Sequence, residues 1–418
     1  MAFDLRRAWL PFAHRFFPTV GPGGVVDALL SRALHTDVGG IIHVTRHFDV
    51  IEVWQRDDDF SVRIYDEKMT ETTGPFFLGM NDRERYMRDA EVIWRAVRKE
   101  DRDLVQRIAA EETDRALDRV RRTGRVDVVK DVSEPVLASF VARYYGIRVP
   151  DPMVVLRRLQ QTSKFVFAFW SDPKMRADAV KAGGELRRLL EDVIAARRRD
   201  GDVGDGDVMG RFLGMKNGFY DGDVGIARSI AGLASGNLNA PVGLFVFCID
   251  QFLKEGKRVF GEASALARSA SRGNPADDAR LKDFLFEAER FNVYPPFLYR
   301  YAERDTTLAA GTNREKAIPK GSTVINWASI AAFDEEIYER PFDFLPGRPK
   351  WQYLGFGYGR HRCLGEHIGQ TVLHEMTKGL LALPGLRRAP GKAGELTFLD
   401  VKDGKYATSL GLVFDRSS

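Results

Sequence analysis

The chain has 418 residues, and its 44% hydrophobic content is enough to bury a large core. Its 63 basic and 59 acidic residues leave a net charge of only +4 without a basic block, which argues against a nucleic-acid-binding protein. The two cysteines, Cys248 and Cys363, are too few for a disulfide framework, so a reducing, cytoplasmic compartment is expected.

The first part of the chain is predicted to hold a small sheet and no transmembrane anchor. No stretch of the sequence reaches the roughly 18 consecutive apolar residues that a membrane span requires. The short amphipathic segment Leu10–Phe17 is expected to pack on the protein's own surface. β-Branched runs beside turn residues predict strands at Ile41–Val44 and Ile51–Trp54.

Helical periodicity dominates the rest of the chain. Apolar residues recur every three or four positions from Asn81 to Val120. The long, apolar and lightly charged segment Asp223–Phe252 predicts a helix that is buried on most sides. Further helices are predicted over Leu281–Phe291 and from Leu364 to about Leu381, with a turn between strands over Ile318–Ile325.

The lone Cys363 lies in a glycine-rich loop, residues 356–365, directly before the last predicted helix. A buried thiolate stays ionised only if a metal or another cation holds it, and Arg360, Arg362 and an iron ion would all favour that form. The glycines remove side-chain bulk, so a flat macrocycle can lie against the backbone. A phosphate loop would need the full G-x-G-x-x-G or a Lys-Ser/Thr pair, and a zinc site would need spaced ligand pairs; both are missing.

This loop resembles the heme-binding loop of the cytochrome P450 family. The residues that fall on that family's pattern are Phe356, Gly359, His361, Cys363 and Gly365. The resemblance implies the cytochrome P450 fold, mainly α with small β-sheets, predicted here as a single domain over residues 1–418. It also implies a heme b (iron protoporphyrin IX) between the long central helix and the cysteine-loop helix, with Cys363 as the iron ligand and Gly357 in the cradle.

Other segments carry the same resemblance in the expected order. His43 to Ser61 resembles the family's first strand pair and following helix, and Glu287 with Arg290 matches its Glu-x-x-Arg motif. One helical turn separates these two residues, so they can pair with each other and with a third group from the Arg340–Phe342 segment. The family's propionate contacts carry over to Arg300 and His361, and a third contact to Arg85 or Arg88, with Trp94 and Arg98 as another pair.

The central helix departs from the family's pattern. Family monooxygenases usually carry an acid followed by an alcohol there, because splitting dioxygen requires two protons. One alignment puts Leu238 and Asn239 at these positions, and another puts Ala234 and Ser235 there, so neither supplies the acid. Pro241 removes a backbone donor from the same helix and should kink it.

Three functions remain open at this stage. The resemblance favours a monooxygenase that oxidises an apolar small molecule, with a ferredoxin or flavodoxin as electron donor. The donor would dock on a basic patch formed by Lys350, Arg360, Arg362, Arg95, Arg98 and Lys99. The missing acid favours a peroxide or lipid hydroperoxide as oxidant, oriented by Asn237 or Asn239. A heme-binding or sensing protein without catalysis is the third. The residues expected to line the pocket are Phe76, Phe77, Phe165, Phe167, Phe169, Trp170, Asn237, Pro296 and Phe297.

Overall fold

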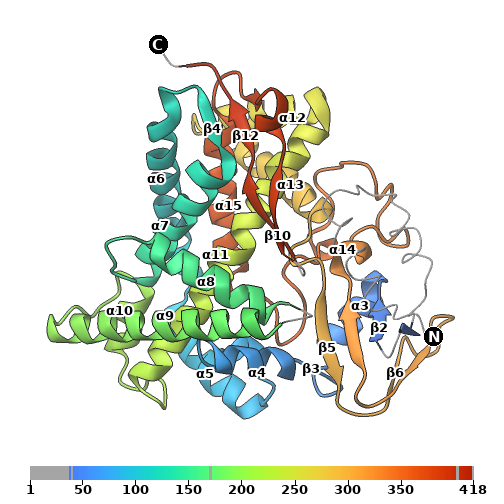
Figure 1. The fold of residues 1–418 in the computed structure, drawn as a ribbon. Helices are drawn as coiled ribbons and strands as arrows, with labels where there is room; N and C mark the ends of the chain where they lie inside the picture. The colour runs from blue at the N-terminus through green and yellow to red at the C-terminus, as the bar shows by residue number, and fades with distance from the viewer. Residues whose placement is uncertain (1–36, 39–40, 169–171, 402–403, 417–418) are drawn as a thin grey trace.

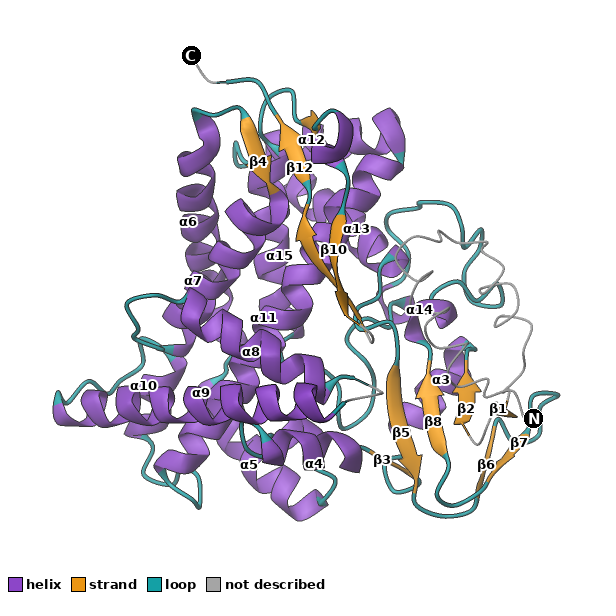
Figure 2. Ribbon diagram, viewed as in Figure 1, coloured by secondary structure: helices purple, strands orange, loops and turns teal. Residues whose placement is uncertain are grey.

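The computed structural model describes residues 37–38, 41–168, 172–401 and 404–416, and the segment Leu10–Phe17 lies outside this part. Helices fill most of the molecule, with strands gathered mainly along one side (Figures 1 and 2). The helices are α3 (His47–Gln55), α4 (Arg63–Glu71), α5 (Arg83–Ala96), α6 (Arg102–Arg121), α7 (Glu134–Tyr145), α8 (Met153–Val166), α9 (Pro173–Arg199), α10 (Val208–Gly214), α11 (Asp223–Lys254), α12 (Gly256–Ala270), α13 (Pro275–Phe291), α14 (Ala328–Ala331) and α15 (Glu366–Leu381). The predicted mainly helical fold with small sheets is therefore confirmed.

The described part of the chain also contains four small sheets. The strands are β1 (Asp37–Val38), β2 (Ile41–Val44), β3 (Phe60–Ser61), β4 (Arg125–Asp127), β5 (Leu298–Ala302), β6 (Thr306–Leu308), β7 (Lys316–Ile318), β8 (Thr323–Asn326), β9 (Arg387–Arg388), β10 (Thr397–Val401), β11 (Gly404–Ser409) and β12 (Gly411–Val413). The largest sheet has the order β1-β2-β8-β5-β3, with β2 parallel to β8 and the register Ile41 opposite Thr323. It therefore joins residues 37–61 with residues 298–326, which are far apart in the sequence.

One predicted strand is wrong. Ile41–Val44 forms β2 as predicted, but Ile51–Trp54 lies inside helix α3. The buried residues of that helix include Val50, Val53 and Trp54, which have the spacing of one helical face. That period outweighs the strand preference of the β-branched side chains, because the face packs in a core with β2 and β5.

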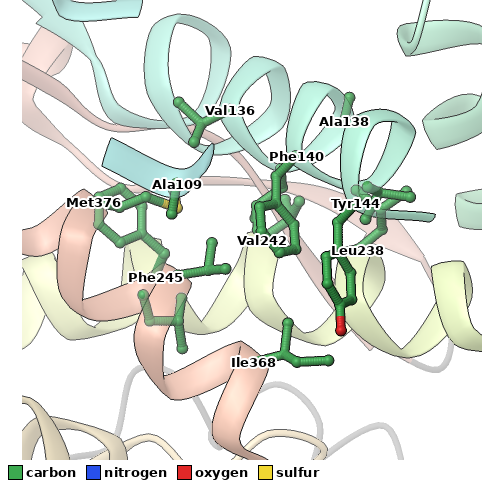
Figure 3. Close-up of a cluster of buried hydrophobic side chains, with 14 of the residues drawn as sticks. Ala109, Val136, Ala138, Phe140, Tyr144, Leu238, Val242, Phe245, Ile368 and Met376 are labelled. Atoms are coloured by element: carbon green, nitrogen blue, oxygen red, sulfur yellow. The ribbon is translucent and has the colours of Figure 1, made fainter. Parts of the chain in front are cut away.

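Helix α11 is the centre of the helical part, as the sequence predicts. It packs against α7, α13 and α15, and α15 also packs against α6. The side chains labelled in this core in Figure 3 are Ala109, Val136, Ala138, Phe140, Tyr144, Leu238, Val242, Phe245, Ile368 and Met376. In the described part of the chain α11 alone is long and apolar enough to cross a membrane, but 61% of its most apolar stretch is buried in the fold, as in a core helix.

The Glu287–Arg290 pair lies on α13 in a fully buried network. Arg290 Nη2 donates to Glu287 Oε1 at 2.7 Å, and both side chains are 0% exposed. The predicted third partner is wrong, because Arg348 fills that place with its Nε 3.2 Å from Glu287 Oε1. Arg340 instead pairs with Asp343 on the surface, where both side chains are more than half exposed. A long side chain further along the loop reaches the buried carboxylate, whereas Arg340 points into solvent.

Candidate heme-thiolate site

Backbone contacts fix the cysteine loop ahead of α15. The Cys363 N–H donates to the Phe356 carbonyl at 2.9 Å, and the Gly357 N–H donates to the Leu354 carbonyl at 3.0 Å. Gly359 has a φ of 73°, and a Cβ there would lie 2.3 Å from the Trp54 carbonyl oxygen. Only glycine fits this position, because any side chain would push the loop off the end of α3.

A cavity opens above this loop, and Cys363 is exposed to it. The cavity is lined by the predicted Phe356, Gly357 and Gly365, together with Arg300 and His361. Burial raises the pKa of the Cys363 thiol to about 11, partly opposed by a hydrogen bond from the Gly365 N–H. The thiolate therefore needs a cation beside it to form near neutral pH.

Only some of the predicted pocket residues line the cavity. Phe76, Phe167 and Asn237 line the cavity, joined by Pro295 rather than Pro296. Three other predicted residues are buried elsewhere in the core, which corrects their assignment: Phe77, Phe165 and Phe297. Phe76 and Phe77 are neighbours, so they point to different sides of their turn, and the Phe77 ring packs against Tyr86. Phe169 and Trp170 lie outside the described residues.

Two buried basic side chains, Arg300 and His361, line the cavity. Arg300 on β5 is 4% exposed, its Nη1 donates to the Tyr299 carbonyl at 3.1 Å, and its Nε has no acceptor among the described residues. His361 Nδ1 lies 2.9 Å from the Leu78 carbonyl, so this nitrogen carries the proton. Burial, with help from Arg300 and Arg360, lowers the pKa of His361 to about 3. An anion between Arg300 and His361 would relieve this repulsion.

These features fit a heme, which combines a metal, a flat apolar ring and carboxylates. The carboxylates would suit the unsatisfied guanidinium of Arg300 and, after proton uptake, His361. The buried Trp54 Nε1, another donor with no acceptor in the described part, also borders the cavity. Cys363 would supply the iron ligand, and Gly357 and Gly365 line the same cavity without side chains.

The arginines predicted for the remaining carboxylate contact lie on α5. Arg88 is exposed and its guanidinium stacks over the Tyr220 ring at 3.9 Å, while Arg85 is half-buried near Asp66. Neither residue is among those that line the cavity. Sequence reasoning missed Tyr86 between them, whose hydroxyl donates to the Arg360 carbonyl at 2.5 Å and whose ring packs edge-on against His361.

The alternative pair on the same stretch faces outward. Trp94 is 47% exposed, and Arg98 forms an exposed ion pair with Asp205 at 3.1 Å. The side chains of both residues are therefore directed toward the surface rather than the cavity, and neither lines it. A carboxylate contact from α5 stays a prediction for Arg85 and Arg88.

The polar residues of α11 divide between two sides of the helix. Asn237 is 6% exposed and lines the cavity, and its Nδ2 donates to the Tyr145 hydroxyl at 2.7 Å and to the Leu233 carbonyl at 3.2 Å. Asn239 does not line the cavity, and its Nδ2 donates to the Ser163 hydroxyl of α8 at 2.6 Å. Ser235 connects the two environments, because it lines the cavity and lies 3.0 Å from Ser163.

A carboxyl group that sequence reasoning missed also lines the cavity. Glu289 on α13 is 8% exposed, and no described side chain forms a hydrogen bond or ion pair with its carboxyl group. Burial raises its pKa to about 8, with Lys350 acting in the opposite direction and Glu366 adding to the rise. Lys350 and Glu366 lie on either side of the cysteine loop in the sequence. The Glu289 carboxyl group therefore lies on the side of the cavity formed by that loop.

Residues 281–382, which include the Glu287–Arg290 pair and the whole cysteine loop, match the pattern that defines the cytochrome P450 family. The chain also superposes on P450BioI in complex with hexadec-9Z-enoic acid ligated acyl carrier protein, with a TM-score of 0.80 at 14% identity over 97% of this chain and 100% of that one. Residues 281–382 thus carry the pattern of the cytochrome P450 family, and the chain has the cytochrome P450 fold that the sequence predicts.

The curated proteins that are similar to this chain include fungal proteins with lipid-related names. A bifunctional dioxygenase–epoxy alcohol synthase of Fusarium oxysporum is 25% identical over 298 residues, which are 65% of this chain and 23% of that protein. A linoleate diol synthase of Gaeumannomyces graminis is 37% identical over 87 residues, 21% of this chain and 8% of that protein. The chain thus spans less than a quarter of the length of these relatives.

Proposed function

We propose that this protein is a heme-thiolate oxidoreductase that acts on an apolar, lipid-like molecule and uses a hydroperoxide as its oxidant. The observation that carries the proposal is the cavity face of α11. The polar side chains of α11 that line the cavity are Ser235 and Asn237 in the described chain, and neither carries a carboxyl group. Dioxygen activation needs two delivered protons, whereas the O–O bond of a hydroperoxide is already reduced. An amide can orient such a group but cannot relay a proton at neutral pH.

The chain's own residues would serve this reaction by binding and orientation. A heme with a thiolate ligand supplies O–O bond cleavage when bound. The cavity wall, with Phe76, Phe167 and Leu244, favours an apolar chain and excludes water. Asn237 would orient the hydroperoxide group. Rearrangement of a lipid hydroperoxide then needs no external electrons, and peroxygenation yields one hydroxylated product and one alcohol.

The similar Fusarium oxysporum protein supports this proposal, because its name combines a dioxygenase with an epoxy alcohol synthase. The similarity is limited to a part of those proteins, so the reaction of this chain stays a proposal. The fatty acyl carrier protein complex of the similar fold supports an extended apolar substrate in the same way.

Dioxygen-dependent monooxygenation is the second candidate, favoured by the Ser163–Ser235–Asn239 cluster. These hydroxyls and the amide could hold an ordered water that delivers protons. The basic patch expected for a ferredoxin or flavodoxin is largely neutralised, since Lys350 pairs with Asp283 and Arg362 with Glu366. Surface pairing of this kind weakens the case for an acidic donor.

The oxidant is tested by mixing the ferric holoprotein with a fatty-acid hydroperoxide in a stopped-flow spectrometer without a reductant. We expect rapid hydroperoxide consumption and rearranged or hydroxylated lipid products. A parallel sample of dithionite-reduced protein meets oxygen with and without a ferredoxin. Product formed only with the ferredoxin would overturn the proposal in favour of monooxygenation. Tight lipid binding without product under either condition would indicate a heme-binding or sensing protein.

A further inference from the structure

The amide of Asn237 is held in one orientation. Its Nδ2 lies 3.2 Å from the Leu233 carbonyl, which can only accept a hydrogen bond, so the nitrogen rather than the oxygen must face that side. The second Nδ2 proton goes to the Tyr145 hydroxyl at 2.7 Å. Both donors of the amide are therefore used within the protein.

The Asn237 oxygen remains for the cavity. No described donor reaches Oδ1, and Asn237 lines the cavity beside Cys363. Asn239 differs, because its Oδ1 is fully buried without a donor and the residue does not line the cavity. The amide also packs against the cysteine loop, since a Cβ at Gly365 would lie 3.2 Å from Asn237 Nδ2 and 3.5 Å from Oδ1. A side chain at position 365 would therefore crowd the amide, which glycine avoids.

Tyr145 is the residue that completes this arrangement. It ends α7, is 0% exposed, and has a pKa raised by burial, so its hydroxyl stays neutral. A neutral hydroxyl accepts from Nδ2 without bringing a charge next to the thiolate side of the cavity. Without it, one Nδ2 proton would lose its acceptor, and the amide could turn that donor toward the cavity.

We propose that Tyr145 is a positioning residue that makes Asn237 present a hydrogen-bond acceptor to the cavity, so that the site selects ligands with an O–H donor. A hydroperoxide and an alcohol carry such a donor, whereas dioxygen, an ether and a ketone do not. This inference rests on the proposed function and deepens it, because it names the group by which the oxidant would be recognised. It concerns binding, so it can be tested without turnover.

The test compares a long-chain alcohol with its methyl ether, each titrated into the ferric holoprotein while the heme absorption band is followed. We expect the wild-type protein to bind the alcohol about fivefold more tightly, the factor that one hydrogen bond of about 1 kcal/mol gives. Asn237→Leu and Tyr145→Phe should each reduce this preference to less than about twofold. The carbon monoxide band of the reduced variants checks that each still holds heme through its thiolate.

Tyr144→Phe is the matched control. Tyr144 precedes Tyr145 on α7, is equally buried, and donates to Asp101 at 2.8 Å instead. This variant should keep the full alcohol preference. An alcohol preference that survives in both Asn237→Leu and Tyr145→Phe would overturn the proposal. The preference could hold while hydroperoxide turnover is absent, in which case the proposed oxidant fails and the positioning role stands.

Discussion

Two glutamates on the same helix show how differently this protein treats buried charge. Glu287 is 0% exposed and receives hydrogen bonds from Arg290, Arg348 and the Leu345 N–H. Glu289, two residues later, is 8% exposed, lines the cavity and has no described donor for its carboxyl group. The network around Glu287 is complete within the chain. On the cavity wall, by contrast, Glu289 has no described donor, and Arg300 Nε has no described acceptor although its Nη1 donates to the Tyr299 carbonyl.

The strongest test of this contrast breaks the complete network. Glu287→Gln would leave Arg290 and Arg348 buried without their carboxylate, so we expect a loss of about 3 to 5 kcal/mol in the free energy of unfolding. Urea unfolding of the holoprotein measures it. Asp343→Asn removes an exposed pair with Arg340 in the same loop and should cost less than about 1 kcal/mol. Equal losses in the two variants would contradict the distinction.

Glu289 should make the stability of the protein depend on pH. Its pKa is raised from 4.5 to about 8 in the folded state, so folding favours the protonated form. The stabilisation is full below the unfolded pKa and is lost as pH rises through the folded pKa. Relative to Glu289→Gln, the wild-type free energy of unfolding should fall by up to about 4 kcal/mol between pH 5 and pH 8. If the free energy of unfolding depends on pH in the same way in both proteins, the Glu289 carboxyl group does not have a raised pKa and the prediction is wrong.

Arg300→Met should not lower the free energy of unfolding, in contrast to the substitution at Glu287. The substitution removes a buried charge with an unsatisfied Nε, so the stability of the heme-free protein should stay equal or rise. Heme affinity should fall by about 1.5 to 3 kcal/mol, because a charge-assisted hydrogen bond to a carboxylate is lost. Chemical unfolding of the heme-free protein and heme transfer to apomyoglobin measure the two effects.

Arg304→Met is the control for Arg300. Arg304 follows the same strand but is 64% exposed and pairs with Asp59, away from the cavity-lining residues. It should leave heme release unchanged. Faster heme release from this variant would show that charge near the strand, rather than a contact in the cavity, governs retention.

Local patterns predicted the parts of the site that lie close together in the sequence. Residue types at short spacing indicated the Cys363 loop, whereas the Glu287–Arg290 pair and Arg300 came from the family resemblance; the structure places the loop and Arg300 at one cavity. Arg348 and Tyr145 could not be predicted, because their partners lie far away in the chain. The role of Glu289 could not be predicted for the same reason, since only the folded structure shows that its side chain lines the cavity.

The secondary structure shows the same division. Long apolar segments such as α11 were predicted nearly to their ends, because one period persists over many residues. The helix α3 was mistaken for a strand over Ile51–Trp54, where a short β-branched run fits either period. The C-terminal end of α3 packs against Gly359 and so supports the cysteine loop. This contact is tertiary, so the local sequence does not predict it.

The parallel pairing of β2 with β8 has a consequence for how the protein is made. Residues 41–44 pair with residues 323–326, so most of the polypeptide must leave the ribosome before this sheet can form. Closing so long a loop is entropically costly and slow, and until then the edge of β2 that faces β8 is open to wrong pairing. Assembly of the helical core around α11, whose contacts with α7, α8 and α9 are nearer in the sequence, can precede the sheet.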